Sequence, residues 1–271
     1  MGEFNKINKE NIRESFNKVI LKQDKVIILY SGVWSFIHKL GFKKNIAKKI
    51  LNIVESVVTE KRTLILPSFS ADSFIKTKIF NLKKTIDKKN GIISNEALKR
   101  NYYRTPQPLH SYLVFGKKKN EIKKLKLQTS WGATSLLGWL SKNNARICVL
   151  GIPWNKGCSY LHRFEELYQV PWRYFKNYNG YIVENNKKKL CVERKYSSPE
   201  NGLLKYDFNP FVNYLKLHQI FLSAKTNFFL ESTTTNQIDR LSKKFYKKNN
   251  FWEIVKNKKK IKNWIKSRDN I

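Results

Sequence analysis

An α/β fold is predicted by the order in which apolar patterns follow one another along the chain. Short apolar runs at 26–30 and 63–66 have the length of buried strands, and the segment between them, 45–58, repeats its apolar residues with the period of a helix. This order favours a sheet that is covered by helices and whose strands run largely parallel. Because hydrophobic residues make up 41% of the 271 positions and aromatic residues 14%, the chain is too apolar to be a disordered protein.

The remaining elements are assigned from the same patterns. Helices are predicted at 8–21, 95–100, 136–140 and 211–221, a helix and loop at 77–90, and strands at 112–115 and 147–150. Two alternating segments, 180–183 and 190–193, flank Asn185-Asn186 and predict a β-hairpin.

The last part of the chain is rich in lysine and has apolar residues at nearly helical spacing, which predicts a C-terminal helix near 247–268. We expect this helix to pack on the core with a solvated lysine face, although a helix lying on a membrane surface has the same pattern. No internal repeat is visible, and the whole chain, 1–271, is assigned to a single domain.

The net charge is strongly positive, at +34, from 54 lysines and arginines against 20 aspartates and glutamates. Lysines are spread along the whole chain, which is typical of a solvated surface in a protein of biased composition. The functional alternative is an anionic partner, such as nucleic acid, a phosphorylated ligand or a membrane face. Three cysteines without CxxC spacing fit neither a zinc site nor a disulfide framework. With no signal sequence and no apolar stretch that could span a bilayer, a cytoplasmic protein is expected.

The segment 146–166 is the strongest candidate for the chemistry. A short buried strand ends at Gly151, and Ser159 is a plausible N-cap for the helix that follows. His162 and Glu165 lie three residues apart and therefore share one helical face. A carboxylate in this place can fix the tautomer of a histidine that acts as general base. An ordinary His/Glu pair on a surface helix would have the same spacing.

Two other segments could position a ligand. Ser31 and Gly32 follow the first strand, where backbone N–H groups of open α/β sheets approach ligands. The two prolines within 104–111 exclude a regular helix and predict a rigid loop that carries polar side chains. A plain strand-to-helix turn and a structural proline loop are the alternatives.

In their order, these motifs resemble the aminoglycoside 3-N-acetyltransferase family, also called antibiotic N-acetyltransferases, nearly from end to end. The matching segments are 24–41, 63–69, 104–111, 150–151, 159–165, 170–171 and 207–208. The segment 159–165 is similar to the family's Thr-x-Leu-His-x-x-Glu signature. This chain departs from the family pattern at four positions: Gln107 replaces the first histidine of the proline loop, Ser159 replaces threonine, Leu136 replaces proline and Pro153 replaces glycine.

The resemblance implies a three-layer α/β/α sandwich and transfer of an acetyl group from acetyl-CoA to a primary amine of an amino sugar, without a metal. It implies that His162 is the general base, that Glu165 orients it, and that the amine attacks the thioester directly. The residues expected to bind acetyl-CoA are Ser31, Gly32, Val33 and Ser111. The residues expected to bind the acceptor are Arg104, Gln107, His110 and Ser159.

Alternatives remain open both for the acceptor of the acetyl group and for the general class of function. Aminoglycosides are polycations, which a protein of charge +34 repels unless the cleft is locally acidic; Glu165, Glu166 and Asp207 are candidates for an acidic rim. An anionic, nucleotide-linked amino sugar used in surface polysaccharide assembly would be attracted by the same charge. Outside acetyl transfer, the alternatives are a nucleic-acid-binding protein, for which no known motif is present, and a non-catalytic family member that acts as a binding module.

Overall fold

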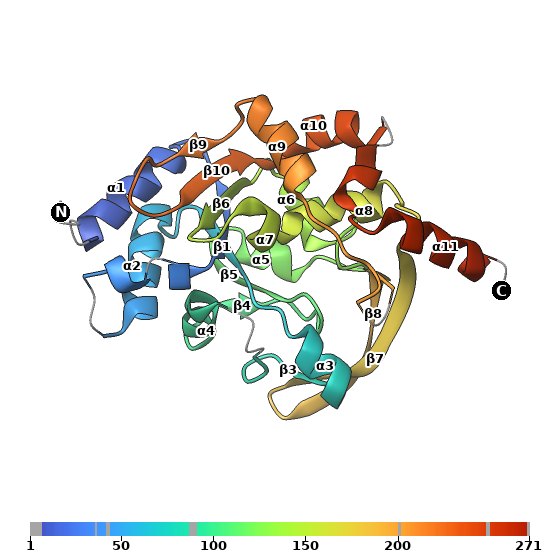
Figure 1. Ribbon diagram of the computed structural model, residues 1–271. Helices are drawn as coiled ribbons and strands as arrows, with labels where there is room; N and C mark the ends of the chain where they lie inside the picture. Colours follow the sequence, from blue (N-terminus) through green and yellow to red (C-terminus); the bar gives the residue numbers. More distant parts are fainter. Residues whose placement is uncertain are drawn as a thin grey trace.

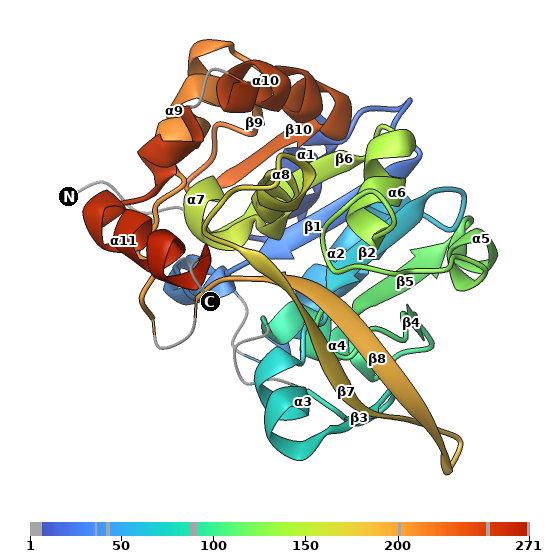
Figure 2. The same ribbon diagram turned by 90° about the vertical axis from the view of Figure 1, so that its right-hand side faces the viewer.

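A seven-stranded mixed sheet forms the centre of the computed structural model (Figures 1 and 2). The structure describes residues 7–35, 37–41, 44–86, 91–199, 202–247 and 250–269. The strands in their order across the sheet are β4 Tyr103–Arg104, β5 Tyr112–Gly116, β2 Thr63–Pro67, β1 Val26–Ser31, β6 Arg146–Leu150, β10 Leu230–Thr234 and β9 Leu222–Ser223.

Only the three central strands of this sheet are parallel. β1 pairs in parallel with β2 and with β6, whereas β5, β4, β10 and β9 are all joined to their neighbours in antiparallel fashion. The expectation of a largely parallel sheet is therefore wrong. Two parallel neighbours need a crossover connection, such as helix α2 Ile46–Val58 between β1 and β2. The long segment after β6 makes no such crossover, and β10 enters the sheet from the opposite end. The carboxyl ends of β1, β2 and β6 nevertheless meet at one edge.

Helices cover both faces of the sheet, as the α/β/α sandwich requires. Successive side chains of β1 point to opposite faces of the sheet: Ile28 and Tyr30 pack in the apolar cluster on one face, and Ile27 and Leu29 pack in the cluster on the other. Burial on both faces explains why this strand is an unbroken apolar run. The first cluster is completed by α6 Leu136–Lys142, α8 His162–Leu167, α9 Asn209–Leu217 and α10 Thr235–Lys247. The second is completed by α1 Lys9–Val19, α2 Ile46–Val58 and α4 Ile92–Leu98 (Figure 1). The predicted fold class is confirmed.

A second, three-stranded sheet projects from the first and contains the predicted hairpin (Figure 2). Its strands are β3 Ile79–Asn81, β7 Tyr174–Glu184 and β8 Lys187–Ser197. Asn185 and Asn186 form the two-residue turn with φ angles of 48° and 62°, which are values that asparagine tolerates better than most residues. The hairpin is thus confirmed, with longer strands than expected.

The region predicted as helix and loop at 77–90 is different in the structure. Helix α3 Ala71–Thr77 ends where that region begins, and β3 follows it directly; residues 87–90 lie outside the described part. β3 forms because β7 offers it an edge, with Ile79 opposite Tyr181. A three-residue strand is too short to show a period in the sequence.

The C-terminal segment is not one helix. It contains the 3₁₀-helix η4 Asn250–Ile254 and the helix α11 Lys258–Asp269, and between them Val255 forms a β-bridge with Tyr206. Asn257 closes the break: its side chain accepts a hydrogen bond from Lys205 N and donates one to Leu203 O. Ile261 of α11 is fully buried, so this helix packs on the core. None of the helices in the described ranges is long and apolar enough to cross a membrane.

Candidate active site

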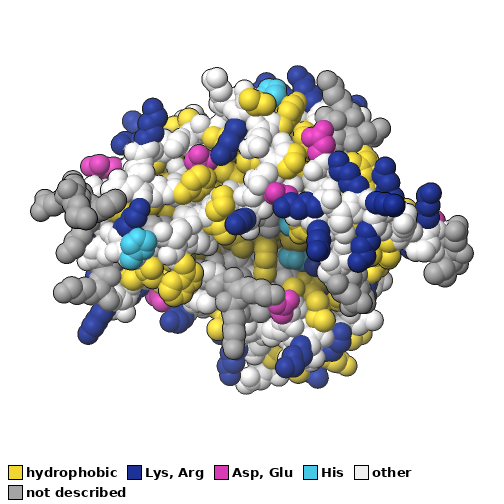
Figure 3. Space-filling view, viewed as in Figure 1, with side chains coloured by type: hydrophobic (Ala, Val, Ile, Leu, Met, Phe, Trp, Pro, Cys, Tyr) yellow, Lys and Arg dark blue, Asp and Glu magenta, His cyan; other side chains and the backbone are white. Residues whose placement is uncertain are grey.

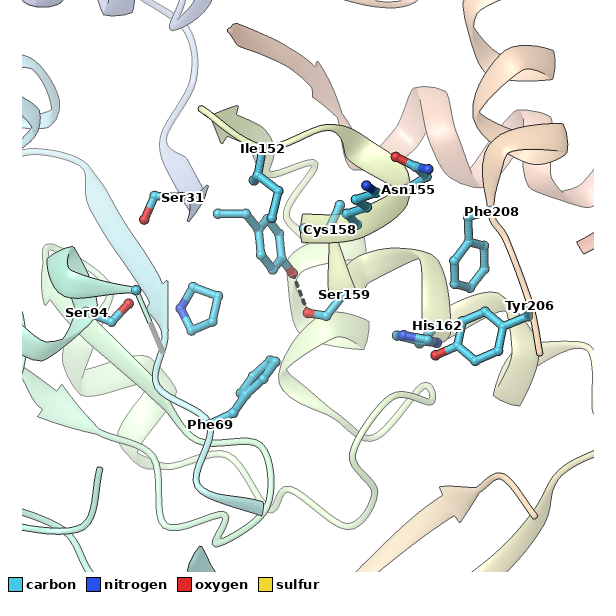
Figure 4. A pocket seen from close by; sticks show the side chains of 15 residues that line it. Ser31, Phe69, Ser94, Ile152, Asn155, Cys158, Ser159, His162, Tyr206 and Phe208 are labelled. Atoms are coloured by element: carbon cyan, nitrogen blue, oxygen red, sulfur yellow. Dashed lines mark hydrogen bonds between the residues drawn. The ribbon is translucent and has the colours of Figure 1, made fainter. Parts of the chain in front are cut away.

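A cleft of about 340 Å³ opens where β1, β2 and β6 end (Figures 3 and 4). It lies between the end of β1, the loop after β2, the start of α4, the segment 152–162 and the chain before α9. Its lining residues are Tyr30, Ser31, Pro67, Phe69, Gly91, Ser94, Ile152, Asn155, Lys156, Gly157, Cys158, Ser159, His162, Tyr206 and Phe208. Ser31 and Ser94 are on one side of the cleft, and His162, Tyr206 and Phe208 are on the other (Figure 4).

His162 and Glu165 form a hydrogen-bonded pair on α8. Nδ1 of His162 lies 2.6 Å from Oε2 of Glu165, and the Glu165 side chain is fully buried. Two further groups hold this carboxylate: Nη2 of Arg173 donates to Oε2 at 2.8 Å, and Nε1 of Trp172 donates to Oε1 at 3.1 Å. Every oxygen of the buried carboxylate is therefore hydrogen-bonded, as a buried charge requires.

The charges of this group favour a neutral histidine beside an ionised carboxylate. Burial opposes ionisation of Glu165, but Arg173 and His162 outweigh it and lower the pKa of Glu165 to about 2. Burial lowers the pKa of His162 below its ordinary value, against the opposing effect of Glu165. A neutral His162 that donates its Nδ1–H to Glu165 keeps the lone pair of Nε2 available as a base.

Ser159 is not the N-cap that the sequence predicted. It begins a 3₁₀ turn, η3 Ser159–Leu161, which leads directly into α8. Its hydroxyl instead donates to the hydroxyl of Tyr30 at 3.1 Å, across the floor of the cleft (Figure 4). The helix starts at His162 because the preceding turn already has helical backbone angles, so the site needs no side-chain cap.

The turn after β1 lies at the opposite side of the cleft. Ser31 lines the cleft, Gly32 N donates to Leu150 O at 2.8 Å, and Val33 is buried. A Cβ atom on Gly32 would lie 3.0 Å from Cβ of Ile152, which is closer than such atoms normally pack. The absence of a side chain at this position therefore lets the ends of β1 and β6 approach each other.

His110 lies behind the cleft lining. Its ring is buried, with its centroid 4.0 Å from that of Trp131, and Trp131 lies 5.5 Å from His162. Nδ1 of His110 is 3.6 Å from Oε1 of Glu193 and makes no hydrogen bond. Burial lowers the pKa of His110 well below its ordinary range, so this imidazole is neutral.

The other polar residues of the proline loop bond to the protein backbone. Arg104 donates to Ser111 Oγ at 3.0 Å and to Ser68 O at 2.7 Å, and Ser111 also donates to Ser68 O. Nε2 of Gln107 donates to Thr129 O at 3.1 Å. These side chains are buried and do not line the cleft. Arg104 and Ser111 hold the loop after β2 that carries Phe69 into the cleft, and Gln107 is bonded to the segment before Trp131. Direct contact of Arg104, Gln107 or Ser111 with a ligand stays a prediction.

Glu165, Glu166 and Asp207 do not form the expected acidic rim of the cleft. Glu165 is fully buried, and Glu166 is buried and accepts a hydrogen bond from Trp131 N at 3.2 Å. Asp207 is partly exposed, but it pairs with Lys256 at 3.4 Å. None of the lining residues in the described part of the chain is Asp or Glu, and Lys156 is among them.

Sequence reasoning missed three residues that this site depends on, namely Arg173, Trp172 and Glu193. Trp172 and Arg173 follow Pro171, and no periodicity in the sequence links them to Glu165. Glu193 was overlooked although it is an isolated acidic residue in a strand of lysines. Among the described residues, no group of three or more His, Cys, Asp or Glu side chains is placed to hold a metal ion.

Comparison with known proteins identifies a family. The family model described as aminoglycoside 3-N-acetyltransferase matches residues 33–255. No curated protein sequence matches the chain.

Several solved structures have the same fold. The YokD protein from Bacillus subtilis is 19% identical with a TM-score of 0.70, over 88% of this chain and 92% of that chain. AAC-IIIb in a binary complex with CoASH is 14% identical with a TM-score of 0.73, over 90% and 97% of the two chains. A mutant of aminoglycoside acetyltransferase AAC(3)-IVa in complex with gentamicin is 14% identical with a TM-score of 0.69, over 91% and 90%. By the match of its sequence over most of its length, the chain belongs to the aminoglycoside 3-N-acetyltransferase family, a family of acyltransferases.

Proposed function

We propose that this protein transfers the acetyl group of acetyl-CoA to a primary amine of an amino sugar, with His162 as general base and Glu165 as the residue that orients it. The observation that carries the proposal is the His162–Glu165 pair: the imidazole of His162 lines the cleft and is hydrogen-bonded to the fully buried carboxylate of Glu165. Family membership supports the reaction type, and the CoASH and gentamicin bound to two structural neighbours support the two substrates.

The reaction needs a base because an amino-sugar amine must lose a proton to form an amide. The amine nitrogen attacks the thioester carbonyl carbon, the carbon–sulfur bond breaks, and CoA leaves as a thiolate. Nε2 of His162 accepts the proton from the attacking nitrogen and returns one to the sulfur, so the enzyme ends unchanged. Glu165 stabilises the imidazolium that exists between these two proton transfers.

Direct transfer is favoured over an acetyl-cysteine intermediate. Cys158 lines the cleft, but burial raises the pKa of its thiol to about 12. A cysteine attacks as the thiolate, which is scarce at neutral pH when the pKa is this high.

The two sides of the cleft are assigned different substrates in this proposal. Ser31, Gly32 and Val33 form the turn against which acetyl-CoA would lie, where the open edge of the sheet presents backbone groups. Ser159 and His162 lie on the side of the acceptor. Arg104, Gln107, His110 and Ser111 would act by holding the loops around it.

The experiment is a thiol-release assay with acetyl-CoA and a panel of amines that includes gentamicin and simple amino sugars, with the product identified by mass spectrometry. We expect amine-dependent release of CoA and a product heavier by one acetyl group. If no amine in the panel increases thiol release above acetyl-CoA hydrolysis, and acetyl-CoA does not bind, the proposal is wrong.

A further inference from the structure

The phenol of Tyr30 lies on the floor of the cleft. Tyr30 is the residue of β1 just before Ser31, and it lines the cleft although its side chain is only 3% exposed. Its hydroxyl accepts a hydrogen bond from Ser159 Oγ at 3.1 Å (Figure 4). None of the hydrogen bonds among the described residues uses the Tyr30 hydroxyl as donor. Since a buried hydroxyl normally has a partner for its proton, this one is suited to a ligand in the cleft.

Ser159 brings this phenol close to the proposed base. The 3₁₀ turn η3 begins at Ser159 and continues directly into α8, which begins at His162. Side chains three residues apart in such a turn lie nearly above one another, with about 5–6 Å between their Cβ atoms. Figure 4 shows Ser159 and His162 following each other along the same wall of the cleft. A small group that touches the Tyr30 hydroxyl is therefore near the imidazole as well.

The donor is fixed in place and keeps its proton. The ring of Tyr30 belongs to the apolar cluster on the α8 side of the sheet, and its backbone lies opposite Val149 in the parallel pair of β1 and β6. Burial raises the pKa of Tyr30 well above its ordinary range, so the phenol is neutral at the pH of a cell. A donor that is already oriented, in surroundings of low polarity, stabilises a developing negative charge more strongly than water does.

Acetyl transfer creates such a charge on the carbonyl oxygen. When the amine attacks the carbonyl carbon, the electrons of the carbon–oxygen double bond move to the oxygen, and they return when the carbon–sulfur bond breaks. His162 handles the proton that leaves the nitrogen and reaches the sulfur. The proposed mechanism therefore leaves the oxygen in need of a hydrogen-bond donor.

The other polar side chains of the described lining are less suited to this oxygen. Ser31 and Ser94 lie across the cleft from the proposed base (Figure 4). Asn155 already donates to a carboxylate at 3.4 Å. Lys156 and Tyr206 are exposed to solvent, where a hydrogen bond gains less than in a buried site.

We infer that Tyr30 is a further catalytic residue, whose hydroxyl donates a hydrogen bond to the carbonyl oxygen of the acetyl group and stabilises the oxyanion formed by the attack. The phenol keeps its proton throughout, so the transfers at nitrogen and sulfur are unchanged. Ser159 supports this donor, because a hydroxyl that accepts a hydrogen bond donates a stronger one. The inference rests on the proposed acetyl transfer and adds the oxyanion donor to it.

The first test removes the hydroxyl and keeps the ring. Tyr30→Phe should lower kcat by about 10²–10³-fold, the cost typical of a lost oxyanion donor, and leave the KM for acetyl-CoA nearly unchanged. Ser159→Ala should lower kcat less, since it removes the support of the donor and not the donor itself. Tyr160→Phe is the matched control: it removes a buried hydroxyl that donates to Asp239 at 2.8 Å and does not line the cleft. It should leave kcat unchanged, and urea unfolding of the variants would show whether a loss of stability explains any difference.

The second test observes the carbonyl group directly. The probe is a ketone analogue of acetyl-CoA in which a methylene group replaces the thioester sulfur and the carbonyl carbon is ¹³C, so that it binds without transferring an acetyl group. A hydrogen bond to the oxygen lowers the infrared stretching frequency of the carbonyl. Binding to the wild type and to Tyr160→Phe should lower this frequency, and binding to Tyr30→Phe should leave it close to that of the free analogue. A side chain that only supports the fold would not produce this difference.

Three results would overturn the inference: full kcat in folded Tyr30→Phe, the same carbonyl frequency in Tyr30→Phe and wild type, or a larger loss of kcat in Ser159→Ala than in Tyr30→Phe. The infrared measurement needs no acceptor, which keeps the two proposals apart. A Tyr30-dependent shift in a protein that acetylates no amine would refute the proposed function and keep the carbonyl site. Acetylation by the wild type and equally by Tyr30→Phe would do the reverse.

Discussion

Nη2 of Arg173 lies 2.8 Å from Oε2 of Glu165, and both side chains are buried. The same oxygen lies 2.6 Å from Nδ1 of His162. The proposed base is therefore the outer member of a three-residue chain in which Arg173 keeps the carboxylate ionised. Arg173 does not itself line the cleft, so it is a positioning residue: it acts through Glu165 and through His162, whose Nδ1 lies 3.3 Å from its Nη2.

Removing Arg173 should destabilise the protein. In Arg173→Met the Glu165 charge would remain buried without its cation, and breaking a buried pair in this way typically costs about 3–5 kcal/mol. The free energy of unfolding in urea measures the loss. The double variant Arg173→Met/Glu165→Gln should recover part of it, because no uncompensated charge remains. Arg240→Met, which removes an exposed arginine of α10, should stay within about 0.5 kcal/mol of the wild type.

Acid should weaken the same pair. The folded-state pKa of Glu165 is about 2, below its ordinary value of 4.5, so this group contributes stability that is fully present above about pH 4.5. That contribution, about 3 kcal/mol, is lost as the pH falls from 4.5 towards 2. Urea unfolding of wild type and Glu165→Gln at pH 6, 4 and 3 should show a difference in stability that shrinks with decreasing pH. A difference that does not change with pH would show that ionisation of Glu165 has no part in it.

Replacing the proposed base should abolish most turnover without preventing binding. His162→Ala is expected to lose about 10²–10⁴-fold in kcat, the range typical of a removed general base, while acetyl-CoA still binds. Glu165→Gln should retain more activity, since it removes orientation and charge support and leaves the imidazole in place. Full activity in a folded His162→Ala protein would refute the assignment, and circular dichroism would show that the variant is folded.

Local patterns predicted the parts of the fold that local chemistry determines. Asn185 and Asn186 marked the hairpin because few other residues accept the backbone angles of its turn. His162 and Glu165 could be paired because three residues along a helix bring side chains together. The N-cap role of Ser159 failed because its hydroxyl has a competing partner, Tyr30, that is distant in sequence.

The rest of the site depends on tertiary contacts that carry no local signal. Arg173 reaches Glu165 only after the chain turns at Pro171, and Glu193 approaches His110 only because the second sheet folds back beside the first. The antiparallel return of β10 is likewise set by the path of the intervening chain. The family resemblance supplied the proposed base but not these partners.

The turn at Gly32 should not tolerate a side chain. A Cβ atom there would lie 3.0 Å from Cβ of Ile152, which lines the cleft, so Gly32→Val should push Ile152 into the space proposed for acetyl-CoA. Crowding of this kind costs about 1–3 kcal/mol, and we expect the KM for acetyl-CoA to rise about tenfold or more. Ile53→Val, a change in the buried face of α2 away from the cleft, controls for a general loss of stability. An unchanged KM in Gly32→Val would mean that this turn does not contact the co-substrate.

The pH dependence of kcat at saturating substrates should report His162. Its pKa is lowered by burial and by the nearby charges of Arg173 and Lys195, and is raised by Glu165. Since the neutral imidazole is the active form, kcat should stay constant from pH 8 down to below about 6.5, the ordinary pKa of histidine, and fall only at lower pH. An inflection above this value, retained when the acceptor amine is exchanged for one of different pKa, would contradict a base with a lowered pKa.

Two variants should move this inflection in opposite directions. Glu165→Gln removes the charge that raises the pKa of His162, so protonation of the base should require still lower pH and the acid limb should move down. Lys195→Gln removes a charge that lowers the same pKa, so the acid limb should move up. Lys189→Gln, with the same change in net charge at a distant position, should leave the limb where it is. The charges of Glu165 and Lys195 act on the pKa of His162 in opposite directions, so their removal must shift that pKa in opposite directions. A shift of the same sign in Glu165→Gln and Lys195→Gln would therefore show that the kinetic pKa belongs to a group other than His162.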